Sequence, residues 1–333
     1  MRAVFHIGRP KCGTTSIQVF LQENSDRLSA QGVLYSRSDN EISSQWEFPI
    51  AALCRSKKDI PDPFVSRLLG FNDQADQIAY STAKLSEFDQ LLEEHSATHH
   101  TWVGSSEHAV PYLRNPEQVA ALDTILKERF DEVRYVLHVR RQEDLIASAF
   151  AEGIRRGDAT GLNEYVDRVL AKHRFNHMWL TRKWTKVIEK DKLSVRLLEP
   201  DALIDGDLCR DFANILDVDA SDFTFPDPAN TGPAKRTLPY VLILNRMVAN
   251  AGQRSPIRRK IRDTGVDLVN RFFGDGPKMK LDRDTIARIR NHSAISNEKL
   301  RKAFFPERPE LFPEHTPNKS MQNQTTHQSV ATF

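Results

Sequence analysis

The sequence predicts an α/β fold of three layers, with a mostly parallel central sheet and a helical C-terminal region. Short apolar runs alternate with segments of helical period over residues 3–198, a pattern typical of βαβ units. Over residues 238–305 the period is helical throughout, apart from the turn sequence at 274–277. A chain of 333 residues can bury a substantial core. We therefore expect one domain over residues 1–312, with a helical cap at about 236–305.

The expected strands are short and rich in apolar residues. In chain order they cover residues 3–7, 32–35, 101–104, 133–139 and 193–198. The expected helices have apolar residues three or four positions apart. They include residues 17–21, 85–92, 117–130, 145–149 and 165–190. The last of these should carry one aromatic face, formed by Tyr165, Phe175, Trp179 and Trp184.

Composition narrows the choice of partners and location. The net charge of +2 predicts no nucleic-acid binding, because tracking a phosphate backbone needs a dense basic stripe. Three cysteines far apart in the sequence argue against a disulfide framework and favour a reducing compartment. We find no signal sequence or spanning segment, and therefore expect a cytoplasmic protein without stable membrane insertion. The polar residues 313–333 should form a disordered tail.

The segment between the first expected strand and helix carries the strongest functional signal. Residues 8–15 read Gly-Arg-Pro-Lys-Cys-Gly-Thr-Thr, and a loop at a helix N-terminus offers backbone N–H groups to an anion. The side chains of residues 14–16 should cap the N-terminus of the helix that follows, by accepting hydrogen bonds from its free backbone N–H groups. A nucleoside-triphosphate loop places Lys directly after its second Gly, whereas here Thr14 holds that position and Lys11 precedes Gly13. The loop therefore suits a 5′-phosphate better than Mg-ATP; the alternative is a tight turn with a helix cap.

The run from Pro10 to Thr15 resembles the P-K-x-G-T-T loop with which PAPS-dependent sulfotransferases grip the 5′-phosphosulfate of their donor, 3′-phosphoadenosine 5′-phosphosulfate. The resemblance implies a P-loop-like fold. It also implies that donor-binding residues are Lys11, Cys12, Gly13, Thr14, Thr15 and Ser16. We expect Arg9 to be solvated, and Cys12 to fill space in the loop rather than act as a nucleophile.

A second resemblance follows the fourth expected strand. Sulfotransferases carry an Arg at the end of a strand and a helical Ser eight residues later, which together hold the 3′-phosphate of the donor. The matching residues here are Arg140 and Ser148. Arg141 stands where the family more often has Asn, so either arginine could make the contact. An alternative is a surface arginine pair at the start of an amphipathic helix.

Candidate bases follow the third expected strand. Sulfuryl transfer to a hydroxyl gains from a group that removes the hydroxyl proton. The Ser-Ser-Glu-His segment resembles the corresponding stretch of bacterial and glycan sulfotransferases, and Glu107 is our first candidate and His108 our second. Alternatively, Glu107 caps a helix or pairs with an arginine, and His108 is a buried imidazole with its hydrogen bonds satisfied. We expect His6 and His138 to belong to the core.

These signals together predict a sulfotransferase that transfers the sulfuryl group of PAPS to an acceptor hydroxyl and releases PAP, with Lys11 stabilising the leaving charge and no metal required. A carbohydrate acceptor rests on the family resemblance alone. The rivals are a P-loop nucleotide kinase or NTPase, and a catalytically inactive protein that binds PAP or PAPS. The basic run at residues 254–262 is interpreted as a groove for an acidic glycan, a lid over the donor, or a solvated helix face.

Overall fold

The fold is built on a five-stranded parallel sheet with the strand order β2-β3-β1-β4-β5. The computed structural model describes residues 1–36, 44–226, 234–250, 256–274, 276–277 and 279–313. The strands are β1 (Arg2–Ile7), β2 (Val33–Tyr35), β3 (Thr101–Ser106), β4 (Glu132–Val139) and β5 (Leu193–Leu197). Every pairing between them is parallel. The predicted parallel sheet is confirmed.

Helices cover both faces of this sheet. The helices are α1 (Thr14–Glu23), α2 (Ser25–Ala30), α3 (Glu47–Arg55), α4 (Pro63–Leu68), α5 (Gln74–His95), α6 (Ala109–Tyr112), α7 (Pro116–Lys127), α8 (Gln142–Arg155), α9 (Leu162–Leu170), α10 (His177–Thr185), α11 (Leu208–Leu216), α12 (Leu238–Asn250), α13 (Pro256–Phe273) and α14 (Arg283–Phe304). Three short 3₁₀ helices are η1 (His173–Phe175), η2 (Lys190–Lys192) and η3 (Ile204–Gly206).

The central strand β1 shows how the layers are held together. Its side chains alternate between the two faces, so Phe5 packs with buried residues of α3, α5 and α7, whereas Val4 packs with those of α1, α2 and α11. Because both faces are covered, five of the six β1 residues are buried, which explains a continuous apolar run instead of an alternating one. The predicted three-layer α/β arrangement is confirmed.

The long helix predicted over residues 165–190 is wrong. The chain instead forms α9, η1 and α10, because the Asn176 side chain accepts a hydrogen bond from the Trp179 backbone N–H and starts a new helix there. The aromatic residues consequently face different surroundings. Trp184 is fully buried in the core beside the sheet, whereas Trp179 is 41% exposed. Sequence analysis also missed α3 and α4, within a polar stretch whose residues 37–43 lie outside the described ones.

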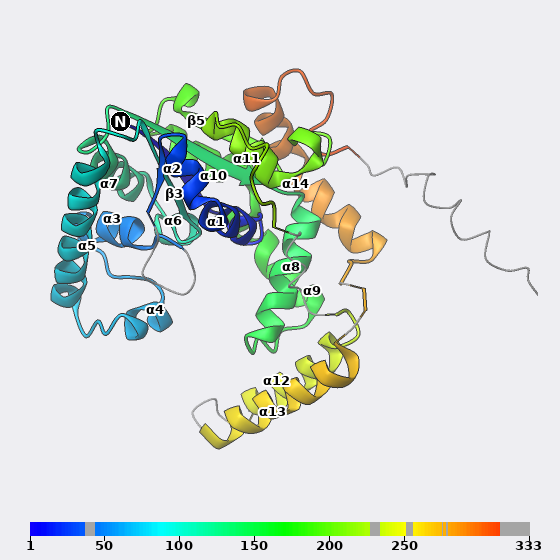
Figure 1. Ribbon diagram of the computed structural model, residues 1–333. Helices are drawn as coiled ribbons and strands as arrows, with labels where there is room; N and C mark the ends of the chain where they lie inside the picture. Colours follow the sequence, from blue (N-terminus) through cyan, green and yellow to red (C-terminus); the bar gives the residue numbers. More distant parts are fainter. Residues whose placement is uncertain (37–43, 227–233, 251–255, 275, 278, 314–333) are drawn as a thin grey trace, which may run out of the picture.

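The C-terminal region is helical, as predicted. α12 and α13 form a hairpin that extends away from the sheet beyond α8 and α9 (Figure 1), while α14 packs against α8 and α10. Within the described part of the chain, no helix combines the length and apolar character needed to cross a membrane. The single-domain boundary at residue 312 stays a prediction, and the predicted tail, from residue 314 on, lies outside the described residues.

Candidate active site

The two loops with candidate phosphate ligands meet beside the central strand. The chain leaves β1 toward β2 on one side of the sheet and leaves β4 toward β5 on the other, so the carboxyl ends of β1 and β4 flank a topological switch point, the usual ligand site of open α/β sheets. The residue 8–13 loop follows β1, and Arg140 follows β4. The Arg140 guanidinium lies against this loop, with Nη1 3.5 Å from the Lys11 carbonyl oxygen. The structure therefore brings Lys11 and Arg140 together.

The loop after β1 turns sharply. Lys11 has a φ of 70° and Gly13 a φ of 80°, both in the left-handed region. Such a conformation is unfavourable for lysine, and residues of this kind are concentrated at functional sites. Gly13, not a Thr or Ser, is the N-cap residue of α1, and no side chain caps this helix. The predicted N-cap role of residues 14–16 is therefore wrong, because these residues lie inside the first turn of α1 and the Thr14 hydroxyl has another partner.

That partner is Glu107, at the end of β3. The Thr14 hydroxyl donates a hydrogen bond to Glu107 Oε2 at 3.2 Å. The Gly8 N–H donates to the Ser106 carbonyl oxygen at 2.8 Å, which joins the two loops through their backbones. A Cβ atom at position 8 would lie only 2.5 Å from Glu107 Cα. Gly8 is therefore required for the close approach that places a carboxylate beside the Lys11 loop.

His108, the second candidate base, has different neighbours. Its Nδ1 lies 3.1 Å from the Ser44 hydroxyl, and its ring contacts the rings of Trp46 and Tyr112. Burial lowers the pKa of His108, an effect that the negative charge of Glu107 partly offsets. The described contacts of the His108 ring are thus with residues before α3 and in α6, whereas Glu107 contacts the loop.

The cations of the site are held by weak ion pairs. Lys11 Nζ lies 3.7 Å from Glu152 Oε2, and Arg140 Nε lies 3.8 Å from Asp144 Oδ2. The Lys11 and Arg140 side chains are 32% and 34% exposed. Long, partly solvated ion pairs contribute little energy, so a bound anion can compete with these carboxylates. Lys11 and Arg140 are therefore available to a ligand.

The carboxylates that pair with Lys11 and Arg140 also show where Ser148 lies. Asp144, Ser148 and Glu152 are spaced by four residues on α8 and so share one face of this helix. Because Asp144 reaches Arg140 and Glu152 reaches Lys11, this face is directed toward the loop, and half-buried Ser148 lies between the two contacts. Burial raises the pKa of Glu152, but hydrogen bonds from Arg155 and Arg156 and the charge of Lys11 lower it to about 2. Glu152 is consequently ionised at neutral pH.

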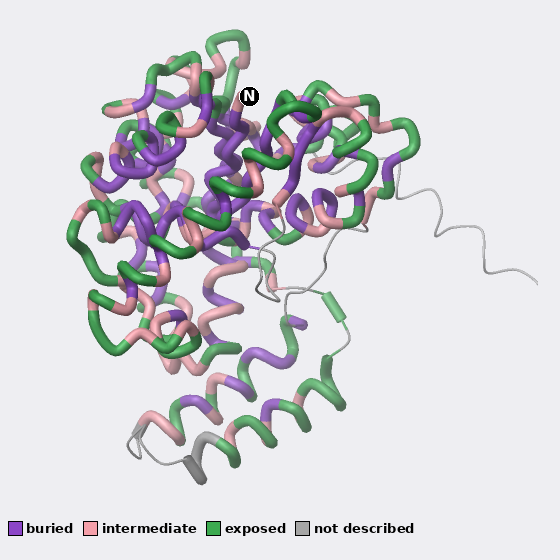
Figure 2. Tube along the Cα trace, turned by 60° about the vertical axis from the view of Figure 1, so that its left-hand side comes forward, coloured by how far each residue is buried: buried purple, intermediate pink, exposed green. Residues whose placement is uncertain are grey.

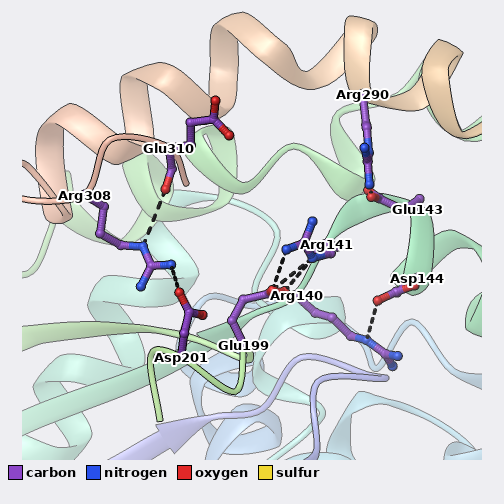
Figure 3. A network of polar contacts seen from close by, with 9 residues as sticks. All are labelled: Arg140, Arg141, Glu143, Asp144, Glu199, Asp201, Arg290, Arg308 and Glu310. Atoms are coloured by element: carbon purple, nitrogen blue, oxygen red, sulfur yellow. Dashed lines mark hydrogen bonds and ion pairs between the residues drawn. The ribbon is translucent and has the colours of Figure 1, made fainter. Parts of the chain in front are cut away.

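The two adjacent arginines have separate roles (Figure 3). Arg141 is 2% exposed and makes three hydrogen bonds of 2.7 to 2.9 Å with the Glu199 carboxylate. The Phe312 ring lies 5.8 Å from its guanidinium carbon. Burial and short bonds with Glu199 hold Arg141 in the protein interior. Arg140 is the arginine beside the loop.

Arg9 is not solvated, contrary to the prediction. It is 3% exposed, and its guanidinium lies 5.7 Å from the Phe175 ring centroid. Its Nη2 donates to the Arg174 carbonyl oxygen at 2.8 Å, and its Nη1 lies 2.6 Å from His177 Nδ1. The side chain is buried because η1 and α10 supply partners from a part of the chain that is remote in sequence.

His177 is a residue of this site that sequence analysis missed. Its Nε2 lies 2.7 Å from the Arg140 carbonyl oxygen, while its Nδ1 faces Arg9. A guanidinium only donates hydrogen bonds and a carbonyl only accepts them, so His177 must be neutral with its proton on Nε2. Burial and the positive charge of Arg9 hold its pKa well below the ordinary value, which agrees with the neutral form. His177 thus connects the loop after β1 with the loop after β4.

The remaining predicted residues have simpler surroundings. Cys12 is fully buried against residues of α8, and burial raises the pKa of its thiol, so a role as loop filler fits better than one as nucleophile. Thr15 is exposed and Ser16 is half-buried at the start of α1. His6 and His138 are fully buried with their rings in contact, which confirms their prediction as core residues.

Comparison with known proteins finds only distant structural similarity. No family model matches the chain. No curated protein matches its sequence. A sulfotransferase from Alicyclobacillus acidocaldarius is similar at 12% identity and a TM-score of 0.48, over 90% of this chain and 94% of its own. The sulfotransferase domain of the curacin biosynthetic pathway is similar at 11% identity and a TM-score of 0.39, over 87% of this chain and 96% of its own. Function must therefore be inferred from the site.

Proposed function

We propose that this protein is a sulfotransferase that transfers the sulfuryl group of PAPS to an acceptor hydroxyl. One observation carries the proposal. Lys11 and Arg140 come from two different strand ends, meet at the sheet's switch point and are only weakly paired with carboxylates. Two cationic groups beside a helix N-terminus suit a ligand with phosphates at two positions, such as a 3′,5′-substituted adenosine.

The residues of the site fit this donor. Lys11 and the backbone N–H groups at the start of α1 would hold the 5′-phosphosulfate, and Arg140 with Ser148 the 3′-phosphate. PAPS supplies the sulfuryl group and leaves as PAP. Glu107 would accept the proton of the acceptor hydroxyl, because its carboxylate lies beside the loop and Thr14 fixes one of its oxygens. Lys11 would stabilise the charge that develops on the leaving phosphate.

Ligand binding tests the donor. Thermal shift or calorimetry would compare PAP with ADP, each with and without Mg²⁺. A ligand that binds only the folded protein adds roughly 2.7 kcal/mol of stability at a hundred times its Kd. We expect stabilisation by PAP without metal and little by ADP. Stabilisation by ADP only in the presence of Mg²⁺ would instead identify a kinase or NTPase.

Glu107→Gln tests the base. The amide keeps the shape of the side chain but cannot take a proton, so we expect PAP binding to persist while turnover falls by about a hundredfold or more. The measurement is PAP formed from PAPS in the presence of a panel of saccharides, our first choice of acceptor. His108→Gln is the matched control. An equal loss in both variants would contradict the role of Glu107, and an inactive wild type that still binds PAP would favour a donor-binding protein without catalysis.

A further inference from the structure

The α12–α13 hairpin concentrates exposed apolar side chains. Thirteen large apolar residues are exposed in the described part of the chain, and seven of them belong to this hairpin. They are Tyr240, Ile243, Met247, Ile261, Leu268, Phe272 and Phe273. The three on α12 are spaced by three and four residues, and Ile261, Leu268 and Phe272 by seven and four. Each helix therefore carries an apolar stripe along one side.

Both stripes lie on the same, outer side of the hairpin. The helices run antiparallel, with Tyr240 stacked on Phe273 and Leu244 packed against Gly265. On α12, Asn245 faces the body and donates to the carbonyl oxygen of Ile154 at 2.7 Å. On each helix, the apolar stripe is rotated by about a quarter turn from the side that faces the partner helix. Because the two helices are antiparallel, both rotations lead to the same side of the hairpin. That side is opposite the face that packs on α8. Figure 2 shows the hairpin standing clear of the body, with exposed positions along α13.

The hairpin is also strongly cationic. Residues 235–273 contain nine Lys and Arg against two Asp, a net charge of +7. The whole chain has a net charge of +2, so the remainder carries +2 minus +7, or −5. Of the described side chains, Lys260 and Arg271 are exposed on α13. Of the basic run noted in the sequence, Lys260 and Arg262 lie on α13, whereas Arg254 lies outside the described residues. By sequence, residues 235–273 are a positively charged segment of an otherwise acidic chain.

We propose that the outer face of the α12–α13 hairpin docks onto an anionic lipid surface. An exposed apolar stripe flanked by Lys and Arg is the pattern of helices that lie in the membrane interface, with apolar residues among the acyl chains and cations at the phosphates. A second copy is a poorer occupant, because it would bring two copies of the segment 235–273, each with a net charge of +7, together. A nucleic acid would satisfy the charge but leave the apolar stripe in water.

Docking there would bring the candidate active site close to the lipid surface. The hairpin packs on the C-terminal end of α8, where Arg262 donates to the Arg155 carbonyl oxygen. Glu152, the partner of Lys11, is within one helical turn of these contacts. The docking proposal does not depend on the donor's identity, since it rests on the hairpin alone.

Vesicle co-sedimentation of the full chain tests the proposal. Vesicles of phosphatidylcholine mixed with phosphatidylglycerol are compared with phosphatidylcholine alone. We expect binding to the anionic vesicles and little to the neutral ones. The apolar-face variant combines Ile243→Ser, Leu268→Ser and Phe272→Ser, and should weaken binding about tenfold or more. Its matched control combines Phe64→Ser, Leu68→Ser and Ile295→Ser, side chains of similar exposure on other helices, and should bind like the wild type.

A charge variant completes the design. Lys260→Glu with Arg271→Glu should weaken binding about tenfold or more, whereas Lys172→Glu with Lys299→Glu, at exposed positions elsewhere, should change it much less. Circular dichroism and thermal unfolding check that each variant is folded. Equal binding to neutral and anionic vesicles, or equal losses in the apolar-face variant and its control, would overturn the proposal. So would a wild-type dimer that the apolar-face variant dissociates, because the face would then join two copies.

Discussion

At the residue scale, His177 illustrates how one buried side chain can set the geometry of a surface site. Its ring nitrogens fix the Arg9 side chain on one side and the Arg140 carbonyl oxygen on the other. Its two contacts use both ring nitrogens in fixed donor and acceptor roles. We therefore assign it as a positioning residue.

Replacing His177 should loosen the site as well as the fold. In His177→Phe, Arg9 Nη1 and the Arg140 carbonyl lose their partner, and unsatisfied buried groups cost about 1–3 kcal/mol each. We expect lower stability in urea denaturation and about a tenfold or larger loss of PAP affinity at a temperature where the variant is folded. His177→Gln, which can both donate and accept, should recover part of each loss.

His173→Phe, at an exposed neighbouring position, is the control and should leave PAP affinity unchanged. If His177→Phe loses stability but binds PAP as tightly as the wild type, His177 is purely structural.

At the scale of elements, the β4–α8 junction separates ligand binding from structural support. Arg140 and Arg141 are adjacent, but one is 34% exposed with an ion pair of 3.8 Å, and the other is buried with hydrogen bonds of 2.7 to 2.9 Å. The difference arises because the chain turns from strand to helix here. Arg140 is thereby directed to the Lys11 loop, and Arg141 to Glu199 after β5 (Figure 3).

Substituting Arg140 should therefore affect mainly nucleotide binding, and substituting Arg141 mainly stability. Arg140→Ala should change stability by less than about 0.5 kcal/mol and remove most of the preference for PAP over ADP. Arg141→Ala leaves the Glu199 carboxylate buried without its partner, and should cost about 3–5 kcal/mol. Chemical denaturation and calorimetry with both nucleotides measure the two effects. A large stability loss in Arg140→Ala, or a selective binding loss in a folded Arg141→Ala, would reverse the assignment.

At the scale of the whole molecule, buried neutral histidines should make stability depend on pH. Burial lowers the pKa of His6 to about 3, and holds the pKa values of His138 and His177 well below the ordinary one. In the unfolded chain a histidine titrates near pH 6.5. Below that pH the unfolded state gains protons that the folded state does not bind. The stabilisation from these neutral histidines is therefore fully present above about pH 6.5 and is lost as the pH falls. For His6 the loss continues down to about pH 3, its pKa in the folded protein.

Urea denaturation between about pH 7.5 and pH 5 should show this loss, at about 1.4 kcal/mol per pH unit for each histidine below pH 6.5. The carboxylates with lowered pKa values, such as Glu132 and Glu152 at about 2, do not contribute in this window, because their ordinary pKa is 4.5. His6→Asn should reduce the dependence of the unfolding free energy on pH by the contribution of one histidine, about 1.4 kcal/mol per pH unit. Constant stability across the window would contradict the neutral, buried state of these rings.

The sequence by itself determined the sheet, its two helical layers and the order of the motif residues. Continuous apolar runs such as β1, and the Gly-rich loop that follows it, are local patterns whose meaning depends on few distant residues. The sequence also predicted that Lys11 and Arg140 lie at the same edge of the sheet, because the carboxyl ends of parallel strands meet there.

Only the tertiary structure decided which polar groups are buried and with whom they pair. The sequence does not distinguish the buried Arg9 and Arg141 from the partly exposed Arg140. The partners that bury them, His177 and Glu199, lie 168 and 58 residues away. Burial of a charge depends on such distant partners, since an unpaired charge would be too costly to bury. The apolar stripes of α12 and α13 likewise acquire meaning only when the fold leaves them facing outward, where no described residue covers them.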